Sequence, residues 1–432
     1  MSNAAPRTIE HLNTDCACIT LDTEALCRAA GQIVGDPEFC RTLSITHPHL
    51  LSAQPVFLSV PHAESMRGLI AAIEAVARMP AYQAEVLIDA PEIARFVPGA
   101  RSVFMGYDFH IGPSGPKLIE INTNAGGALL NAYLLQAQRA CCPDMAWAAD
   151  EHRIAIERLP SIFVEWFKSE WALQGQGQSL RSIAIVDQAP RQQYLYPEFV
   201  LFQRLFQAYG MTAIIAAPED LSRRDGALWH GDQRIDLVYN RLTDFELALP
   251  ASRALREAYV GNAVVVTPNP RAHALFARKT NLAILSDPDR LRRLGVGEEL
   301  IARLVAAIPR TEIVRLADPK DLWARRNGLF FKPASGFGGK AAYRGDKITR
   351  KVWEEILAGD YVAQAIVAPS TRTITVDGQA HSMKADIRCY AYDGNVPLMA
   401  ARIYQGQTTN FRTRGGGFSP VFVGEDRDCT AC

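Results

Sequence analysis

The strongest constraint on the fold is the alternation of short apolar segments with helical ones between residues 180 and 275. Strands are predicted at 183–186, 212–216, 235–239 and 263–267, and an amphipathic helix at 198–209. Strand–helix–strand order with short connections is typical of a parallel, doubly wound α/β domain. The preceding Gly175-Gln-Gly-Gln-Ser179 has the composition of a linker, so we expect this domain to begin near residue 180.

Length and charge restrict the class of protein. A chain of 432 residues is long enough for two or three domains. Its 46 basic and 46 acidic side chains give no net charge, so nothing in the composition attracts nucleic acid or an anionic membrane. No apolar run approaches the ~20 residues that span a bilayer, and the first residues have no secretion signal. We expect a cytoplasmic protein with small-molecule substrates, no nucleic-acid or membrane partner, and a homodimer as the default assembly.

The cysteines do not form a disulfide-framework pattern. There are nine, scattered and odd in number. Cys429 and Cys432 form a lone CxxC, for which free thiols are favoured over a zinc site.

The spacing of apolar residues predicts the secondary structure of the rest of the chain. Residues 1–100 are expected to be mainly helical, with one buried helical face formed by Met66, Leu69, Ile70, Ile73, Val76 and Ala77. Strands are predicted at 103–111 and 117–122, joined by a turn-rich connection at 112–116, and helix follows at 129–168. We therefore predict three parts: 1–174, which carries this hairpin within 100–130, a doubly wound domain at 180–275, and a mixed region at 276–432.

The hairpin brings oxygen-bearing side chains together. Alternate residues of a strand share a face, so Glu120 and Asn122 point the same way. With a five-residue loop Ile111 faces Lys117, which places Asp108 opposite Glu120, and two carboxylates in that position repel each other. Asp, Glu and Asn oxygens on one face suit Mg²⁺. The alternative is a solvated acidic pair.

A second candidate site lies in the last third of the chain. Lys332 ends a predicted strand that runs into a glycine-rich loop containing Ser335, Gly336, Gly338 and Gly339. Backbone N–H groups of such a loop, together with a lysine, can hold phosphate, although for this motif alone a glycine-rich turn without a ligand is the favoured interpretation. The apolar strand at 361–367, with Gln364 and Val367, could bind a purine edge through its backbone or be a plain core strand.

Arginines follow in the C-terminal segment. Arg388 and Arg402 lie in predicted strands, and Asn410 precedes a run of three glycines. Arginines on neighbouring strands can stabilise charge on a transferring phosphoryl group, and singly they are also common surface residues.

Together these motifs resemble the ATP-grasp superfamily of carboxylate–amine ligases. The resemblance covers roughly 265–432 and 100–130, with weaker likeness at 180–265. It implies that Lys332 and Lys279 contact phosphates, that the glycine-rich loop is a lid, and that 364–367 contacts adenine. It also implies that Asp108, Glu120 and Asn122 match the D…ExN magnesium set, and that Arg388, Arg402 and Asn410 lie where phosphates and substrate meet.

The order of the motifs departs from the usual one. D…ExN normally follows the arginine strands, but here it lies far upstream of them. This order is similar to circularly permuted ATP-grasp proteins such as eukaryotic-type glutathione synthetase and glutathionylspermidine synthase. In such proteins an arginine follows an apolar strand of the preceding domain, which makes Arg241 a candidate for a substrate carboxylate; a strand-capping arginine is the alternative.

The resemblance implies an ATP- and Mg²⁺-dependent ligase that joins a carboxylate to an amine through an acyl phosphate. A kinase that uses the same ATP site is an alternative, as is a nucleotide-binding module without catalysis. The sequence identifies neither the acid nor the amine.

Overall fold

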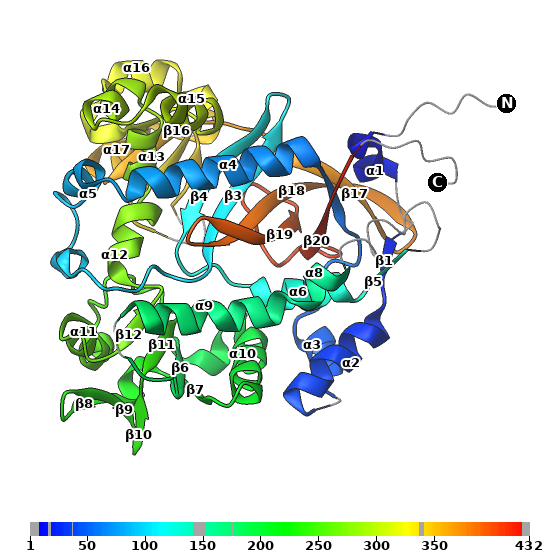
Figure 1. Cartoon of the computed structure of the whole chain (residues 1–432). Helices are drawn as coiled ribbons and strands as arrows, with labels where there is room; N and C mark the ends of the chain where they lie inside the picture. The colour runs from blue at the N-terminus through cyan, green and yellow to red at the C-terminus, as the bar shows by residue number, and fades with distance from the viewer. Residues whose placement is uncertain are drawn as a thin grey trace.

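We describe the protein from a computed structural model, in which residues 8–15, 19–36, 38–140, 153–174, 177–336 and 341–425 are described. Within these residues, five sheets and the helices between them are arranged as Figure 1 shows. In the described part of the chain no helix is both long enough and apolar enough to cross a bilayer.

The largest sheet joins strands from both ends of the chain. Its order is β2-β20-β19-β18-β3-β4, with β17 on β18, and the β2–β20 pair is parallel while the others are antiparallel. The strands are β2 (Val56–Ser59), β3 (Met105–Gly112), β4 (Gly115–Asn122), β17 (Ser370–Val376), β18 (Gln379–Tyr392), β19 (Asn395–Tyr404) and β20 (Gly417–Gly424).

A parallel sheet lies within residues 182–267, as the alternation of strands and helix predicts. Its order is β12-β11-β6-β7. The strands are β6 (Ser182–Val186), β7 (Thr212–Ala216), β11 (Leu237–Asn240) and β12 (Val265–Thr267). The strands β8 (Leu221–Arg224), β9 (Ala227–His230) and β10 (Gln233–Ile235) form a small antiparallel sheet beside it.

A four-stranded antiparallel sheet, in the order β13-β16-β14-β15, lies within residues 311–365. Its strands are β13 (Thr311–Ile313), β14 (Leu329–Pro333), β15 (Tyr343–Arg344) and β16 (Tyr361–Ala365), while β1 (Ile19–Leu21) pairs with β5 (Gln138–Ala140) elsewhere. The helices around it are α13 (Thr280–Leu285), α14 (Pro288–Arg293), α15 (Glu298–Ala307), α16 (Pro319–Ala324) and α17 (Arg350–Ala358). The remaining helices are α1 (Ile9–Asp15), α2 (Thr23–Val34), α3 (Phe39–Thr46), α4 (Val60–Ala77), α5 (Pro80–Val86), α6 (Ala128–Gln136), α8 (Arg153–Glu157), α9 (Leu159–Leu173), α10 (Tyr196–Ala208), α11 (Arg253–Val260) and α12 (Pro270–Ala272).

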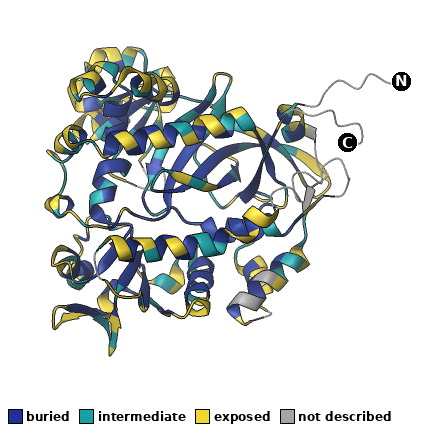
Figure 2. Ribbon diagram, in the orientation of Figure 1, coloured by how far each residue is buried: buried dark blue, intermediate teal, exposed yellow. Residues whose placement is uncertain are grey.

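Helix α4 buries the apolar face that its sequence pattern predicts. The hydroxyl of Ser59 caps its first turn, and the predicted apolar face is buried along its length. This face packs on Tyr107, Phe109 and Ile387 of the large sheet, so α4 covers that side of β3 and β18 (Figures 1 and 2). Each fully buried Leu or Ile contributes roughly 1.5–3 kcal/mol to stability.

The N-terminal region is mainly helical, as predicted, with the short strands β1 and β2 in addition. Strand β2 was not predicted, because its partner β20 is far away in sequence. Cys389 is free and buried, and Cys27 is disulfide-bonded. Cys429 and Cys432 lie outside the described residues.

Candidate active site

Strand alternation places four charged side chains on one face of the large sheet. In β18 the residues Ile387 and Cys389 pack toward α4, so Asp386 and Arg388 face the other way. Register aligns Arg388 with Asp108 of β3, and Asp386 with Arg402 of β19. These four side chains therefore meet opposite the α4 face.

The hairpin of β3 and β4 has the predicted pair Asp108–Glu120, but its turn and its register differ from the prediction. The turn has two residues rather than five, since Gly112 pairs with Gly115, and Ile111 faces Pro116 instead of Lys117. A regular ladder from this turn would place Asp108 opposite Ile119. A bulge at Ile119 adds one residue to β4 and restores the pair Asp108–Glu120.

Asp108 is at the centre of the charged group. Its carboxylate accepts two hydrogen bonds from Arg388, from Nε and Nη2 at 2.7 Å each, one from Arg402 Nη2 at 2.9 Å and one from Asn122 Nδ2 at 3.0 Å. Burial alone would raise the pKa of Asp108, but the two guanidinium groups lower it to about 2. The carboxylate is therefore ionised at every ordinary pH.

Arg402 also connects this group to the loop after β19. Its Nε donates to Asp386 Oδ1 at 2.7 Å, and Thr409 Oγ1 donates to the other oxygen of Asp386 at 2.5 Å. Asp386 is fully buried. Arg402 thus lies between two carboxylates, with a geometry that is fixed from both sides.

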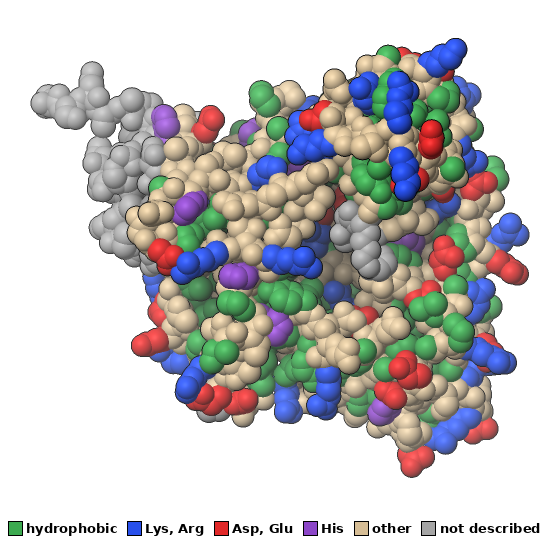
Figure 3. Space-filling view, turned by 180° about the vertical axis from the view of Figure 1, so that it is seen from behind, with side chains coloured by type: hydrophobic (Ala, Val, Ile, Leu, Met, Phe, Trp, Pro, Cys, Tyr) green, Lys and Arg blue, Asp and Glu red, His purple; other side chains and the backbone are tan. Residues whose placement is uncertain are grey.

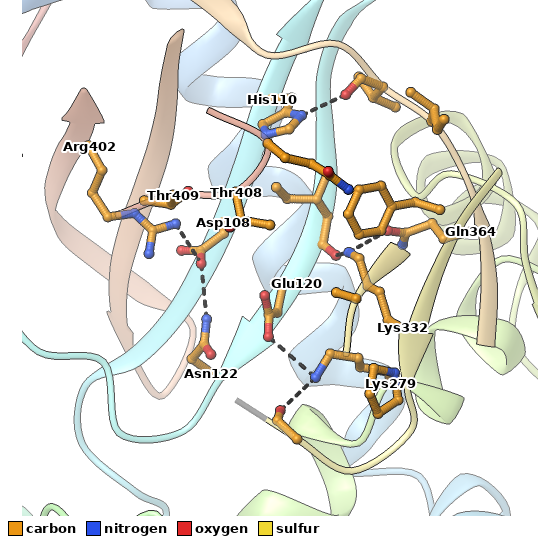
Figure 4. Close-up of a pocket in the computed structure, with 18 of the residues that line it drawn as sticks. Asp108, His110, Glu120, Asn122, Lys279, Lys332, Gln364, Arg402, Thr408 and Thr409 are labelled. Atoms are coloured by element: carbon orange, nitrogen blue, oxygen red, sulfur yellow. Dashed lines mark hydrogen bonds and ion pairs between the residues drawn. The ribbon is translucent and has the colours of Figure 1, made fainter. Parts of the chain in front are cut away.

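Two lysines face this cluster of aspartate and arginine side chains from the opposite side of the pocket. Lys332 of β14 donates to the Ile119 carbonyl at 2.9 Å and to Gln364 Oε1 at 2.8 Å. Lys279 donates to the Gly336 carbonyl at 2.8 Å, and its Nζ lies 3.5 Å from Glu120 Oε1 (Figure 4). Burial lowers the pKa of Lys332 to about 8, so its charge is lost just above neutral pH.

These groups surround one pocket of about 260 Å³ between the large sheet and the β13-β16-β14-β15 sheet. The predicted site residues that line it come from β3, β4, β14, β16, β18, β19 and the segments beside them. They are Asp108, Glu120, Asn122, Lys279, Lys332, Gly336, Gln364, Val367, Arg388 and Arg402.

Other predicted residues lie elsewhere. Ser335 is exposed beside the pocket, and Gly338 and Gly339 are outside the described residues. The amide of Asn410 faces its own loop: it donates to the carbonyls of Gln405 and Thr408 and accepts from the Arg412 amide and the Thr413 hydroxyl. Asn410 thus shapes the loop, and no contact with the pocket supports a catalytic role for it.

Several lining residues were not predicted. His110 and Phe330 lie two positions from Asp108 and Lys332, so strand alternation could have identified both. His110 forms a hydrogen bond of 2.7 Å with the Val367 carbonyl, and burial lowers its pKa. Ile119, Pro333, Ala342, Tyr404, Gln407, Thr408 and Thr409 also line it, and Ala365 and Ile366 belong to the segment 364–367 that was predicted to contact adenine. The loop residues among them have no periodic pattern that would identify them.

Arg241 belongs to a separate buried group at the end of the parallel sheet. It follows β11, and Asp187 follows the neighbouring β6, so both lie at the carboxyl ends of adjacent strands. The Arg241 Nη1 donates to the Asn124 carbonyl at 2.9 Å, while its buried Nε has no hydrogen-bond partner among the described residues. Burial raises the pKa of Asp187 to about 6, although Arg241 opposes this shift.

The chain order makes this position distinctive. From β6 the chain passes to β7 on one side and later to β11 on the other, so the sheet changes winding direction between β6 and β11. Crevices at such a switch point are the usual ligand sites of open α/β sheets. The carbonyl of Asn124, which accepts from Arg241, lies two residues after Asn122, which lines the pocket.

No known family model matches the sequence, and no curated protein does. Among solved structures, the chain is similar to a glutathione synthetase-like effector from Globodera pallida in apo form, with 9% identity, a TM-score of 0.56, and coverage of 93% of this chain and 98% of that one. It is also similar to a putative gamma-glutamylcysteine synthetase from Methylobacillus flagellatus, with 12% identity, a TM-score of 0.44, and coverage of 82% and 86%. A third similarity is to the ATP-grasp ligase PsnB complexed with minimal precursor, Mg and ADP, with 15% identity, a TM-score of 0.29, and coverage of 56% and 88%.

Of these three, the effector alone has a TM-score above 0.5, and its similarity extends over nearly the whole of both chains. The protein therefore has an ATP-grasp-type fold of the glutathione synthetase-like kind. At 9% identity this similarity concerns the fold alone. The circular permutation stays a prediction.

Proposed function

We propose that this protein is an ATP- and Mg²⁺-dependent ligase that joins a carboxylate to an amine. The single observation that carries the proposal is the pocket in which Lys279 and Lys332 face Arg388 and Arg402. Four cationic side chains around one cavity suit a triphosphate, and the ATP-grasp-type fold gives them a context in which that ligand is expected. Over the face shown in Figure 3, basic and acidic side chains are interspersed, which favours small substrates over a polyanion.

The residues fit a magnesium ion. One oxygen of Glu120 and the Oδ1 of Asn122 have no hydrogen-bond partner among the described residues, and both side chains line the pocket. Carboxylate and amide oxygens are suitable Mg²⁺ ligands. When bound there, the ion neutralises phosphate charge.

The chain's own groups would then position the reactants. Lys279 and Lys332 hold the phosphates, and the backbone amide of Val367, which lines the pocket, can donate to the adenine edge. The substrate carboxylate attacks the γ-phosphorus, ADP leaves, and Arg388 and Arg402 stabilise the charge on the transferred group. The amine then attacks the acyl phosphate, inorganic phosphate leaves, and an amide bond remains. Closure of the pocket protects the acyl phosphate from water.

Arg241, at the switch point of the parallel sheet, is our candidate for binding the substrate carboxylate. The unpartnered Nε can donate to an oxygen of the substrate, and Asp187 beside it can accept from an ammonium group. A zwitterionic end, as in an amino acid or peptide, matches this pair. An Arg241→Lys variant, which keeps the charge but loses the planar donor pair, should raise the substrate KM while leaving ATP affinity unchanged.

The first experiment is thermal unfolding with ATP and Mg²⁺, together and separately. We expect a rise in Tm that needs both, corresponding to about 2.7 kcal/mol at a hundredfold excess of ATP over Kd. Glu120→Gln should lose the Mg²⁺-dependent part, while Glu64→Gln, on the exposed face of α4, should behave as the wild type. Release of phosphate dependent on an acid–amine pair then separates a ligase from a kinase. If millimolar ATP with Mg²⁺ leaves the wild-type Tm unchanged, the proposal is wrong.

A further inference from the structure

Three aromatic side chains from distant parts of the chain meet at the surface and form what we call the aromatic patch. His47 follows α3, Tyr194 lies in the loop between β6 and α10, and Phe411 lies in the loop between β19 and β20. The ring centroids of His47 and Tyr194 are 4.9 Å apart, and those of Tyr194 and Phe411, which are stacked, are 5.6 Å apart. Tyr194 is 38% exposed and Phe411 is half-buried, so the patch has an open side.

The inner end of the patch is packed against the start of α6. The ring of Phe411 lies 4.7 Å from that of Phe418, which is fully buried. Phe418 in turn lies against Gly127, where a Cβ would be 2.2 Å from the ring. Phe411 is therefore supported from the core, and its stack with Tyr194 extends outward from that support.

The outer end of the patch adjoins the group around Arg241. The loop that ends at Tyr194 begins at Asp187, the carboxylate beside Arg241. Leu195, the next residue, contacts Gly126, because a Cβ at Gly126 would lie 2.3 Å from Leu195 Cδ1. The same Cβ would lie 2.6 Å from Arg241 Nη2. One backbone segment thus separates the patch from the candidate site for the substrate carboxylate.

The loop that carries Phe411 also reaches the nucleotide pocket, and its shape is fixed by hydrogen bonds. Thr408 and Thr409 line the pocket, and Thr409 donates to Asp386 at 2.5 Å. The side-chain amide of Asn410 makes four hydrogen bonds within the loop, two as donor and two as acceptor. Phe411 is consequently held in place without a ligand, which lowers the entropic cost of binding one.

We propose that Tyr194 and Phe411 form a subsite for an aromatic side chain of the substrate, an amino acid or peptide whose charged end binds at Arg241 and Asp187. The inference rests on the proposed function and specifies the class of substrate that the ligase takes. Aromatic rings prefer offset-stacked or edge-to-face neighbours, and the open side of the patch offers rigid rings for such a contact. Its place between the pocket and Arg241 is where a substrate that reaches both would lie.

The affinities of three dipeptides test the inference. Alanyl-phenylalanine, phenylalanyl-alanine and alanyl-alanine are titrated by NMR into the full chain with Mg²⁺ and a non-hydrolysable ATP analogue. We expect at least one phenylalanine dipeptide to bind about tenfold or more tightly than alanyl-alanine. In Tyr194→Ala this preference should fall to about threefold or less. Equal affinities for the three dipeptides in the wild type, or no binding of any of them, would overturn the inference.

Two further variants separate substrate binding from loop packing. Phe411→Leu keeps an apolar contact with Phe418 but loses the stack, so it should also lose most of the preference. Tyr209→Ala removes a tyrosine of similar exposure, 43%, at the end of α10 and should keep it. A preference that survives in both Tyr194→Ala and Phe411→Leu would mean that the rings only join the loops.

The same samples distinguish this inference from the proposed function. The rise in Tm with ATP and Mg²⁺ is measured on each of them. If the rise is present while the dipeptides bind equally, the aromatic subsite is wrong and the proposed function stands. If the rise is absent in the wild type, the proposed function fails, and this inference fails with it.

Discussion

Nucleotide affinity should fall with rising pH because Lys332 loses its proton. Its ammonium group donates to the Ile119 carbonyl and to Gln364, but burial still lowers its pKa to about 8. The charged form of Lys332 therefore predominates below pH 8 and is lost progressively as the pH rises above 8. At pH 9 about one-tenth of the free protein carries this charge, so ATP affinity should be about tenfold lower than at pH 7, a difference of ~1.4 kcal/mol.

Calorimetry can measure this effect. A non-hydrolysable ATP analogue with Mg²⁺ is titrated at pH 7, 8 and 9, in two buffers of different ionisation enthalpy. Bound phosphate favours the ammonium form, so binding above pH 8 should take up close to one proton. Lys332→Arg keeps the charge at every pH and should remove both the uptake and the slope.

Two outcomes would refute the reasoning. Affinity that stays constant from pH 7 to 9 in the wild type would mean that Lys332 does not face the phosphates. An equal slope in Lys332→Arg would place the titrating group elsewhere.

Three further predictions concern stability and reactivity. Gly127→Ala should destabilise the fold by about 2–6 kcal/mol in urea unfolding, because the residue has φ +96° and a Cβ would lie 2.2 Å from Phe418 Cζ; Gly210→Ala, with φ +81° and open space around it, should cost only the backbone part. Glu198→Ala should cost roughly 2–6 kcal/mol, since buried N–H groups of Gly127 and Leu129 lose their acceptor, and an effect below 1 kcal/mol would contradict this. Burial raises the pKa of the Cys389 thiol, so peptide mapping should find it alkylated only after unfolding.

The sequence predicted which faces the charged side chains share, because side-chain direction in a strand depends on local geometry alone. Asp108 and Glu120 do oppose each other, but the reasoning behind that prediction contained two compensating errors. The turn is shorter than expected, and the bulge at Ile119 makes up the difference. No residue type marks this bulge, whose position depends on how both strands meet their neighbours in the sheet.

Long-range partners account for most of what could not be predicted. Strand β2 is recognisable only beside β20, and Thr408 and Thr409 reach the pocket through a loop without periodicity. The ion pairs of Asp108 are of the same kind: Arg388 and Arg402 are nearly 300 residues away in the chain, at separations of 280 and 294. The sequence indicated their charges but not that they would bind each other.

The pairing of β3 with β18 also has a consequence for the order of events during synthesis. Strand β3 is synthesised long before its partner β18. At 5–20 residues per second, the ribosome needs roughly 15–55 s to make the 280 residues that separate Asp108 from Arg388. Until then the edge of the β3–β4 hairpin has no neighbour and is open to wrong pairing. A nascent chain of this protein should therefore depend on chaperones for the hairpin, and nucleotide binding should be among the last properties that it acquires.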